Sequence, residues 1–299
     1  MKTLLLTDPM PAGWFNTAVR QLAPDLSLID YRRDMTDAEL ADIEVVLGWQ
    51  FPRGVAGRLP QLKWVCSVAA GVEKLLVPDL AAHVPVSRIV DVEQADGIAQ
   101  FVVMMALRHA RQLPLYEAQQ PRREWARVPM AAERSRVVVL GAGTMGSAVA
   151  RLLATVGFEV RGWSRSTGEA LDAVLAVGYI VVCALPLTAQ TDSLLDARAL
   201  ALMPRGGYLI NIARGAHVVE PDLIAAVRSG HLAGAALDVQ RREPMAADDA
   251  LWGVPGITIT PHIAAQSSPA TVAGQCLAGL HCLHHGLPLP NPVDRQRGY

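Results

Sequence analysis

A glycine-rich turn between a strand pattern and a helix pattern constrains this chain more than any other feature. Val137–Leu140 is typical of a buried strand, and Ser147–Thr155 has the apolar spacing of a helix. The turn between them reads Gly141-Ala142-Gly143-Thr144-Met145-Gly146. In a G-x-G-x-x-G turn, the glycines permit a tight turn, close approach of a pyrophosphate, and close helix–strand packing. The sequence therefore predicts a dinucleotide site with its phosphates at the helix N-terminus.

The end of the next strand pattern indicates which dinucleotide to expect. In an NAD site, an Asp or Glu about 20 residues after the turn binds the ribose 2′-hydroxyl. Here the pattern ends Arg161-Gly162-Trp163-Ser164-Arg165-Ser166, without a carboxylate. With no acid at this position, no negative charge repels a 2′-phosphate, and Ser164 and Arg165 could bind one. NADP(H) is therefore expected, with NAD(H) as the alternative. An arginine on a solvated loop would leave the same pattern.

Strand and helix patterns alternate along most of the 299 residues, more than one domain usually contains. The first strands are expected at Lys2–Thr7, Leu26–Tyr31, Val45–Trp49, Leu62–Val68 and Val86–Val90, with helices near Trp14–Leu22 and Asp37–Ala41. Later strands are expected at Arg136–Leu140, Glu159–Ser164, Tyr179–Leu185, Tyr208–Ala213, Ala235–Val239 and Ile257–Thr260. This alternation predicts an α/β protein with two doubly wound parallel-sheet domains.

A different pattern between the two sets of strands marks the expected crossing between the domains. The acidic stretch Asp91–Asp96 is interpreted as an interdomain loop, and Asp96–Arg111 has the apolar spacing of a long helix. A looser segment follows, which contains Pro114, Pro121 and Pro129. One last helix is expected at Pro269–His284, after the final strand.

The bulk composition argues against several classes of protein. A net charge of −1 and a pI near 6.7 provide no field that would attract nucleic acid or an anionic membrane. The longest apolar runs, Phe101–Leu107 and Tyr179–Leu185, are far shorter than the roughly 20 residues of a membrane span. Four scattered cysteines fit a reduced, cytoplasmic setting. His281, Cys282, His284 and His285 lack a further ligand set, so a solvated helix end is favoured and no metal is expected.

Polar residues follow three of the later strand patterns. They lie in the segments Asn211–Gly215, Leu237–Pro244 and Thr260–His262. Taken singly, each is equally compatible with a solvated rim residue or a local hydrogen bond. Because open α/β sheets bind ligands at the carboxyl ends of their strands, the three together favour a functional site.

In these segments the chain resembles the D-isomer-specific 2-hydroxyacid dehydrogenase family, and most closely its glyoxylate/hydroxypyruvate reductase A branch. The resemblance covers essentially the whole chain; its matching stretches are Gly141–Gly146, Cys183–Thr188, Asn211–Gly215, Leu237–Pro244, Thr260–Ala265 and Val293–Tyr299. It implies a Rossmann cofactor domain over residues 98–265. It also implies a flavodoxin-like substrate domain formed by residues 1–97 and 266–299, and a homodimer formed through the cofactor domain.

The resemblance also assigns roles to single residues. It implies that Arg214, Glu243 and His262 are catalytic and that Asp238 contacts the nicotinamide side. The other cofactor residues it implies, besides the glycine turn, are Trp163, Ser164, Arg165, Ser166, Leu185, Pro186, Thr191, Ile212, Ala213, His262 and Ala264. The substrate residues it implies are Trp49, Ala70, Gly71, Arg214 and His262. For Trp49, the competing interpretation is a core tryptophan. For Ala70 and Gly71, it is an ordinary strand-to-helix turn at Ser67–Val72.

The chemistry of reducing a 2-keto acid suits these residue types. The reaction needs a hydride from the nicotinamide and a proton for the carbonyl oxygen, and histidine can give and recover a proton near neutral pH. A glutamate such as Glu243 would favour the imidazolium form of His262 and orient its ring. Arg214 offers a rigid fork for the substrate carboxylate and keto oxygen.

The sequence therefore predicts an NADPH-dependent reductase of a small 2-keto acid, such as glyoxylate or hydroxypyruvate. Two alternatives stay open. One is a relative that acts on a bulkier 2-keto acid, and the other is a non-enzymatic, nicotinamide-sensing binding protein on the same fold.

Overall fold

The computed structural model describes residues 1–6, 13–129 and 132–298. Within these ranges the chain forms two compact units: unit 1 is residues 1–91 with 267–299, and unit 2 is residues 92–266. Thr7, which was expected in the first strand, and Tyr299, at the end of the last family stretch, lie outside the described residues.

Unit 1 contains a five-stranded parallel sheet in the order β2-β1-β3-β4-β5. Its strands are β1 (Thr3–Leu6), β2 (Leu28–Asp30), β3 (Val45–Gly48), β4 (Trp64–Ser67) and β5 (Val86–Ser87). The five expected strands are therefore present, each with shorter bounds. This order is the flavodoxin-like order of doubly wound sheets, which confirms the fold expected for the first domain.

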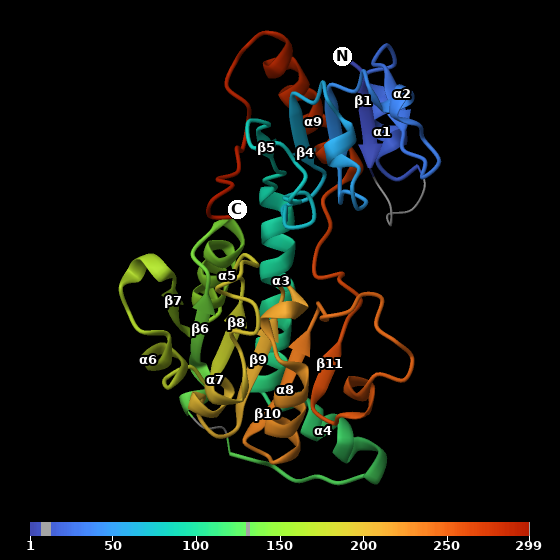
Figure 1. Cartoon of the computed structure of the whole chain (residues 1–299). Helices are drawn as coiled ribbons and strands as arrows, with labels where there is room; N and C mark the ends of the chain where they lie inside the picture. Colours follow the sequence, from blue (N-terminus) through green and yellow to red (C-terminus); the bar gives the residue numbers. More distant parts are fainter. Residues whose placement is uncertain (7–12, 130–131, 299) are drawn as a thin grey trace. The chain divides into compact units, whose positions relative to one another are not determined.

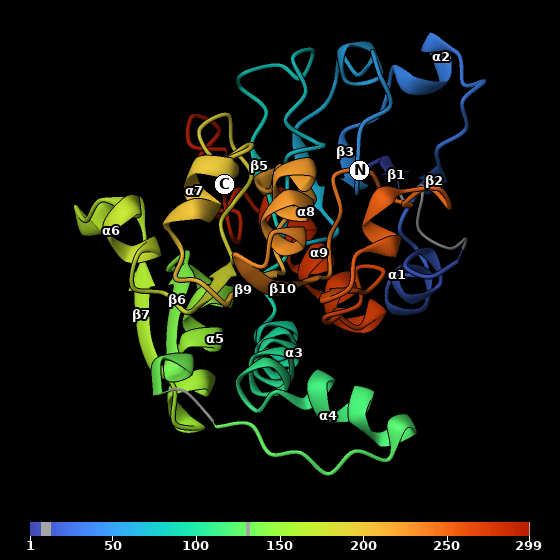
Figure 2. The same cartoon turned by 90° about the horizontal axis from the view of Figure 1, so that it is seen from below.

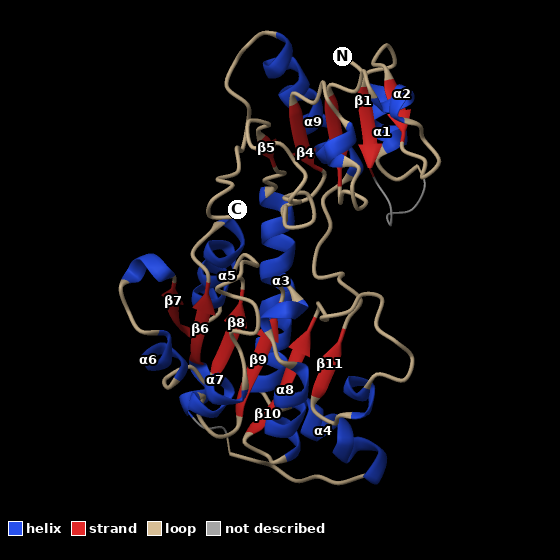
Figure 3. Ribbon diagram, in the orientation of Figure 1, coloured by secondary structure: helices blue, strands red, loops and turns tan. Residues whose placement is uncertain are grey.

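Helices cover both faces of the unit 1 sheet (Figures 1 and 3). They are α1 (Asn16–Leu22), α2 (Asp37–Leu40) and the C-terminal α9 (Pro269–His284). Helix α9 packs on the fully buried Trp64 of β4 at Gly279, where an added Cβ would lie 2.2 Å from the indole ring. A side chain at this position is therefore incompatible with the packing that brings the C-terminal helix back to the first sheet.

Unit 2 contains a six-stranded parallel sheet in the order β11-β10-β9-β8-β6-β7. Its strands are β6 (Arg136–Leu140), β7 (Glu159–Trp163), β8 (Ile180–Cys183), β9 (Gly207–Asn211), β10 (Leu232–Leu237) and β11 (Ile257–Ile259). From β6 the chain turns outward to β7 and then crosses back to β8, on the other side of β6. The winding therefore reverses between β6 and β8, where doubly wound sheets bind ligands at their carboxyl edge.

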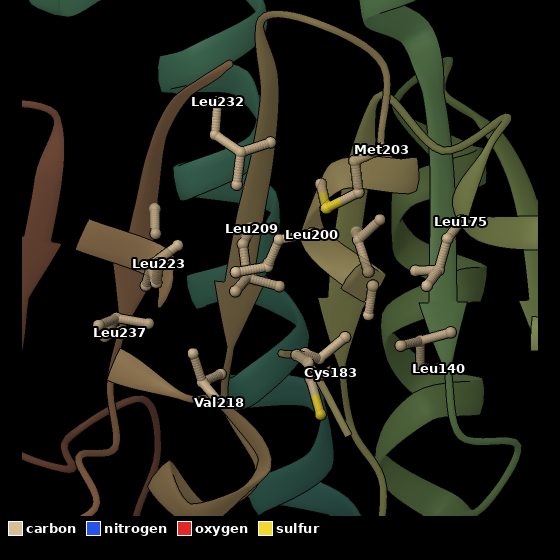
Figure 4. Packing of buried hydrophobic residues seen from close by; sticks show 14 of the residues in the cluster. Leu140, Leu175, Cys183, Leu200, Met203, Leu209, Val218, Leu223, Leu232 and Leu237 are labelled. Atoms are coloured by element: carbon tan, nitrogen blue, oxygen red, sulfur yellow. The ribbon is translucent and has the colours of Figure 1, made fainter. Parts of the chain in front are cut away.

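The helices of unit 2 form a layer on each face of its sheet. They are α3 (Val92–Ala110), α4 (Leu113–Gln119), α5 (Thr144–Thr155), α6 (Leu171–Leu175), α7 (Ala197–Leu202) and α8 (Glu220–Arg228). Figure 2 shows α7 and α8 on one face, and α3 and α5 on the other. Leu200 of α7 and Leu223 of α8 pack with Leu209 and Cys183 of the strands, as Figure 4 shows. Both faces of the central strands are thus buried, as their continuous apolar runs indicate.

Two expectations around the long helix are wrong. Helix α3 begins at Val92, so the stretch Asp91–Asp96 is largely helical and is not a loop. Acidic residues such as Glu93 stabilise the first turn of a helix through its dipole, and they do not indicate a loop here. The segment after α3 is not loose throughout, because Pro114 lies in the first turn of α4, where proline is tolerated.

His109, in the last turn of α3, makes the stability of unit 2 depend on pH. Its ring stacks on Tyr208 and Tyr179, with centroids 4.4 and 5.7 Å away, and it is 9% exposed. Burial, with the nearby charge of Arg134, lowers the pKa of His109 from 6.5 to about 4. Between these two pH values the unfolded chain binds a proton that the folded chain does not, so stability falls as the pH falls.

We expect a His109→Phe variant to lose most of this pH dependence, because phenylalanine keeps the stacking and binds no proton. For the native chain, the shift corresponds to a loss of roughly 3 kcal/mol of unfolding free energy between pH 6.5 and 4, on top of the effects of other groups. Denaturant unfolding of both proteins at pH 7 and pH 4.5 measures the difference. An equal pH dependence in the two proteins would contradict this role of His109.

Candidate active site

The glycine turn has the geometry of a phosphate cradle. Gly141 has a φ of +118°, and a Cβ there would lie 2.5 Å from the Ala184 carbonyl oxygen. A Cβ on Gly146 would lie 1.9 Å from the Gly141 carbonyl oxygen, whereas nothing lies within 4 Å of one on Gly143. Gly143 is also the N-cap of α5, and no side chain caps this helix end. The turn thus leaves open space at a helix N-terminus, which fits a bound pyrophosphate.

The end of β7 presents hydroxyls and a guanidinium. The Ser164 and Ser166 hydroxyls lie 2.8 Å apart, and Arg165 donates a hydrogen bond to the Gln190 side chain on the loop after β8. The next acid along the chain, Glu169, is ion-paired with Arg161. Positive charge and hydroxyls at this strand end fit a 2′-phosphate.

The indole of Trp163 is not part of this polar group. It is 7% exposed, packs in the core beneath the sheet and donates to the Glu169 carbonyl at 2.9 Å. The indole anchors the loop that follows β7, and the cofactor contact expected of Trp163 stays a prediction.

The loop after β8 is closed by its own side chains. The Thr191 hydroxyl donates to the Pro186 carbonyl at 2.7 Å and accepts from the Thr188 amide at 2.8 Å. Leu185 and Thr191 are buried. Pro186 and Thr191, which are expected to contact the cofactor, therefore lie in a turn that is held by its own hydrogen bonds. This turn lies beside the glycine turn, because the Ala184 amide donates to the Leu140 carbonyl.

Asn211, at the end of β9, shapes the turn that carries Arg214. Its side chain accepts from the Ala213 amide at 3.1 Å and donates to the Arg214 carbonyl at 2.9 Å. Gly215 then packs against the backbone of Gln240, where any Cβ would lie 1.9 Å from the Gln240 carbonyl carbon. The backbone is thus held on both sides of Arg214, so the Cα atom that carries its side chain has a fixed position.

Asp238, at the end of β10, organises the turn that carries His262. The carboxylate is 2% exposed and accepts from the Thr260 hydroxyl at 2.6 Å. It also accepts from the backbone amides of Ile263 and Ala264, both at 2.9 Å. His262 itself has a φ of +56°, a left-handed conformation that a histidine keeps only where its surroundings hold it. Asp238 supplies that support.

Glu243 and His262 form a hydrogen-bonded pair. The distance from His262 Nδ1 to Glu243 Oε2 is 2.9 Å, and the other carboxylate oxygen accepts from the Gln240 amide at 3.0 Å. Burial would raise the pKa of Glu243, but these hydrogen bonds and the charges of His262 and Arg214 lower it below its ordinary value. Glu243 is therefore ionised near neutral pH, and its Nδ1 contact leaves His262 Nε2 as the ring nitrogen available for proton transfer.

The expected residues of unit 2 lie at one edge of its sheet, because they follow the carboxyl ends of β6 to β11. Trp49, Ala70 and Gly71 lie in unit 1, after the ends of its neighbouring strands β3 and β4. The Ser67 hydroxyl donates to the Gly71 carbonyl at 2.7 Å and closes that turn. Trp49 is half-buried, with the Lys74 ammonium 5.7 Å from its ring centroid. Its indole nitrogen is buried without a hydrogen-bond partner, so Trp49 is not a fully satisfied core residue.

Sequence reasoning missed three contributors to this edge of unit 2. The backbone amide of Gln240 donates to Glu243, so the identity of the Gln240 side chain does not indicate this contact. Thr260 and Asn211 were noted only as parts of motifs, and their polar side chains directly after apolar runs were the available signal.

Other polar features of the described residues lie elsewhere. A cavity of about 350 Å³, lined in part by Arg108, His109, Arg134 and Tyr208, opens at the amino ends of β9 to β11 and not at the carboxyl edge. Within the described ranges, no group of three or more His, Cys, Asp or Glu side chains could hold a metal ion. None of the helices described is both long and apolar enough to cross a membrane.

Comparisons with known proteins agree on one family. Residues 103–264 match the family described as D-isomer specific 2-hydroxyacid dehydrogenase, NAD binding domain. A glyoxylate/hydroxypyruvate reductase A from Yersinia enterocolitica is 34% identical, over 92% of this chain and 93% of the relative.

Two crystal structures are similar over almost their whole lengths. A D-isomer specific 2-hydroxyacid dehydrogenase from Xanthobacter autotrophicus, in complex with NADPH and MES, is 37% identical with a TM-score of 0.88, over 100% of this chain and 99% of that one. An NADPH-dependent glyoxylate/hydroxypyruvate reductase from Sinorhizobium meliloti, in complex with NADP and sulfate, is 31% identical with a TM-score of 0.89, over the same shares. The chain belongs to the D-isomer specific 2-hydroxyacid dehydrogenase family.

Proposed function

We propose that this chain is an NADPH-dependent reductase of glyoxylate, hydroxypyruvate or a similarly small 2-keto acid. The observation that carries the proposal is the pair of Glu243 and His262, at the same sheet edge as Arg214 and the glycine turn. The names of the relatives support the same reaction, and a relative with NADPH bound supports the cofactor.

His262 is the proton donor in this proposal. The nicotinamide cofactor, when bound, supplies the hydride. Glu243, ionised and hydrogen-bonded to Nδ1, fixes the plane of the His262 ring and leaves Nε2 for the substrate. Nε2 then gives its proton to the carbonyl oxygen of the substrate as negative charge develops there.

Arg214 binds the substrate in this proposal. Its planar guanidinium can hold the carboxylate and polarise the keto oxygen at once, which a single ammonium cannot do with the same geometry. The Arg214 backbone is held by Asn211 and by the close packing of Gly215, and one guanidinium nitrogen donates to the Ala213 carbonyl at 2.7 Å, which restrains the fork before the substrate arrives. The substrate contacts expected of Trp49, Ala70 and Gly71 remain predictions.

The remaining assignments concern the whole molecule. We infer that unit 2 is the cofactor domain and unit 1 the substrate domain. We also infer a homodimer formed through unit 2, as the family resemblance implies. A cytoplasmic location is supported by the four cysteines, all of which are free thiols.

The test follows NADPH and NADH oxidation with glyoxylate, hydroxypyruvate, pyruvate and phenylpyruvate. We expect turnover with the two small substrates and NADPH, weaker turnover with NADH, and little with phenylpyruvate. Absence of turnover with every keto acid would refute the reductase assignment, and a preference for phenylpyruvate would show a bulkier substrate.

An Arg165→Ala variant tests the basis of the cofactor preference. Loss of a charge-assisted contact to the 2′-phosphate is worth about 1.5–3 kcal/mol, so KM for NADPH is expected to rise about 10- to 100-fold while KM for NADH stays unchanged. Arg198→Ala, which breaks an exposed ion pair with Asp172, is the matched control. Equal changes with both cofactors would remove Arg165 from the 2′-phosphate site.

A further inference from the structure

His217 is a fully buried histidine between two functional turns. It ends the short 3-10 turn Gly215–His217 and is 0% exposed. Its Nδ1 lies 2.9 Å from the carbonyl oxygen of Arg214, and its Nε2 lies 3.3 Å from the carbonyl oxygen of Pro186. The ring therefore contacts the turn after β9 through one nitrogen and the turn after β8 through the other.

Neither carbonyl depends on His217 for a hydrogen-bond donor. The Pro186 carbonyl also accepts from the Thr191 hydroxyl at 2.7 Å, and the Arg214 carbonyl also accepts from the Asn211 amide at 2.9 Å. A buried polar side chain commonly provides a hydrogen bond to a buried backbone group. Here both carbonyls already accept such a bond from another side chain. What His217 adds is a rigid connection between the two turns.

The backbone already holds these segments together further from the site. Ser193 donates to the Ala216 carbonyl at 2.8 Å, and Leu195 donates to the His217 carbonyl at 2.9 Å. The general packing of the two segments therefore does not require the imidazole. Its contribution is local, at the carbonyl of Arg214 itself and at the turn expected to contact the cofactor.

We propose that His217 is a positioning residue that sets the distance between Arg214 and the Leu185–Pro186 turn. This inference rests on the proposed function, in which Arg214 holds the substrate, and on the cofactor contacts that the family resemblance implies for Leu185 and Pro186. A planar ring between two carbonyls is a spacer of fixed length, and small changes in the separation of two reactants are costly in rate.

The charge state of His217 is consistent with this role. Burial lowers the pKa of His217, with Arg214 adding to the effect, while the two carbonyl contacts and Asp192 oppose it. A neutral ring has one N–H, and the shorter distance assigns it to Nδ1, which donates to the Arg214 carbonyl, while the unprotonated Nε2 packs against the Pro186 carbonyl without a hydrogen bond. The spacer therefore persists without a buried positive charge.

The test compares His217→Leu and His217→Asn with the native protein. The Asn side chain can place a donor near the position of Nδ1, so it restores the contact with Arg214 but not the contact with Pro186. For Leu we expect about a 10-fold higher Kd for NADPH, about a 10-fold higher KM for the keto acid, and a 10- to 100-fold lower kcat. For Asn we expect the keto-acid KM to recover while the Kd for NADPH stays raised.

The control is His231→Leu, because His231 Nε2 also contacts a carbonyl, that of Leu200 at 3.2 Å, at the other end of the strands. Melting temperatures are recorded for all variants. A Leu variant that melts earlier but keeps native constants, or Leu and Asn variants with equal impairment, would overturn the proposal. If native protein turns over no keto acid, the proposed function fails, and the NADPH Kd values of the variants still test His217.

Discussion

Replacing His262 with asparagine is expected to lower kcat for keto-acid reduction by about 10²- to 10⁴-fold, the range for loss of a positioned general acid. Asparagine is the appropriate replacement because His262 has a φ of +56°, and asparagine tolerates the left-handed conformation better than most residues. The turn held by Asp238 should then survive, so the loss reports on the proton and not on misfolding.

The measurement is steady-state kcat with saturating NADPH and hydroxypyruvate. The Kd for NADPH from fluorescence titration is the control for the cofactor site, and we expect it to stay within about twofold. A kcat within tenfold of the native value would mean that another group protonates the substrate.

Replacing Arg214 with lysine is expected to lower kcat/KM for the keto acid by about 10²- to 10³-fold, with KM raised and the Kd for NADPH unchanged. Lysine keeps the positive charge but loses the planar fork, so the variant separates geometry from charge. It also keeps the charge that lowers the pKa of Glu243, so the Glu243–His262 pair should be little disturbed.

The matched control for Arg214 is Arg241→Lys. Arg241 is a neighbouring guanidinium that donates to the Ala216 carbonyl at 2.7 Å and to the Ser193 hydroxyl at 3.0 Å. We expect this variant to affect stability more than KM. If both variants raised the keto-acid KM equally, the proposed substrate contact of Arg214 would be contradicted.

The fold could be predicted because its strands are buried on both faces. Continuous apolar runs such as Val137–Leu140 and Ile180–Cys183 mark central parallel strands without further information. The apolar runs do not predict the order of the strands, because that order depends on the side of the sheet on which each helical crossover places the next strand. The start of α3 was also missed, since the acidic residues around Glu93 suit both an exposed loop and a helix N-terminus.

The candidate site was predictable as far as residues at strand ends are concerned. Arg214, Glu243 and His262 each follow a strand, and parallel strands bring their carboxyl ends to one edge. The contacts that these residues make with backbone groups were not predictable. Asp238 supports the His262 turn through backbone amides, and His217 contacts two carbonyls, so neither interaction depends on a partner side chain that sequence could show.

Trp163 illustrates the same limit in the opposite direction. The family resemblance implies a cofactor contact for Trp163, and a large apolar side chain at a strand end is equally suited to the core. In the structure Trp163 is the one buried residue of β7, and its indole donates to the carbonyl of Glu169, a contact with the backbone that the sequence does not show.

The most direct test of the central claim follows the hydride itself. Native protein is incubated with hydroxypyruvate and NADPH that carries deuterium at both C4 positions, and the product is analysed by mass spectrometry. The proposed function predicts one deuterium at C2 of the resulting hydroxy acid, in step with NADPH oxidation, and a loss of labelled product of about 10²-fold or more in His262→Asn. NADPH oxidation without deuterium at C2, or no oxidation at all, would contradict hydride transfer to the keto carbon.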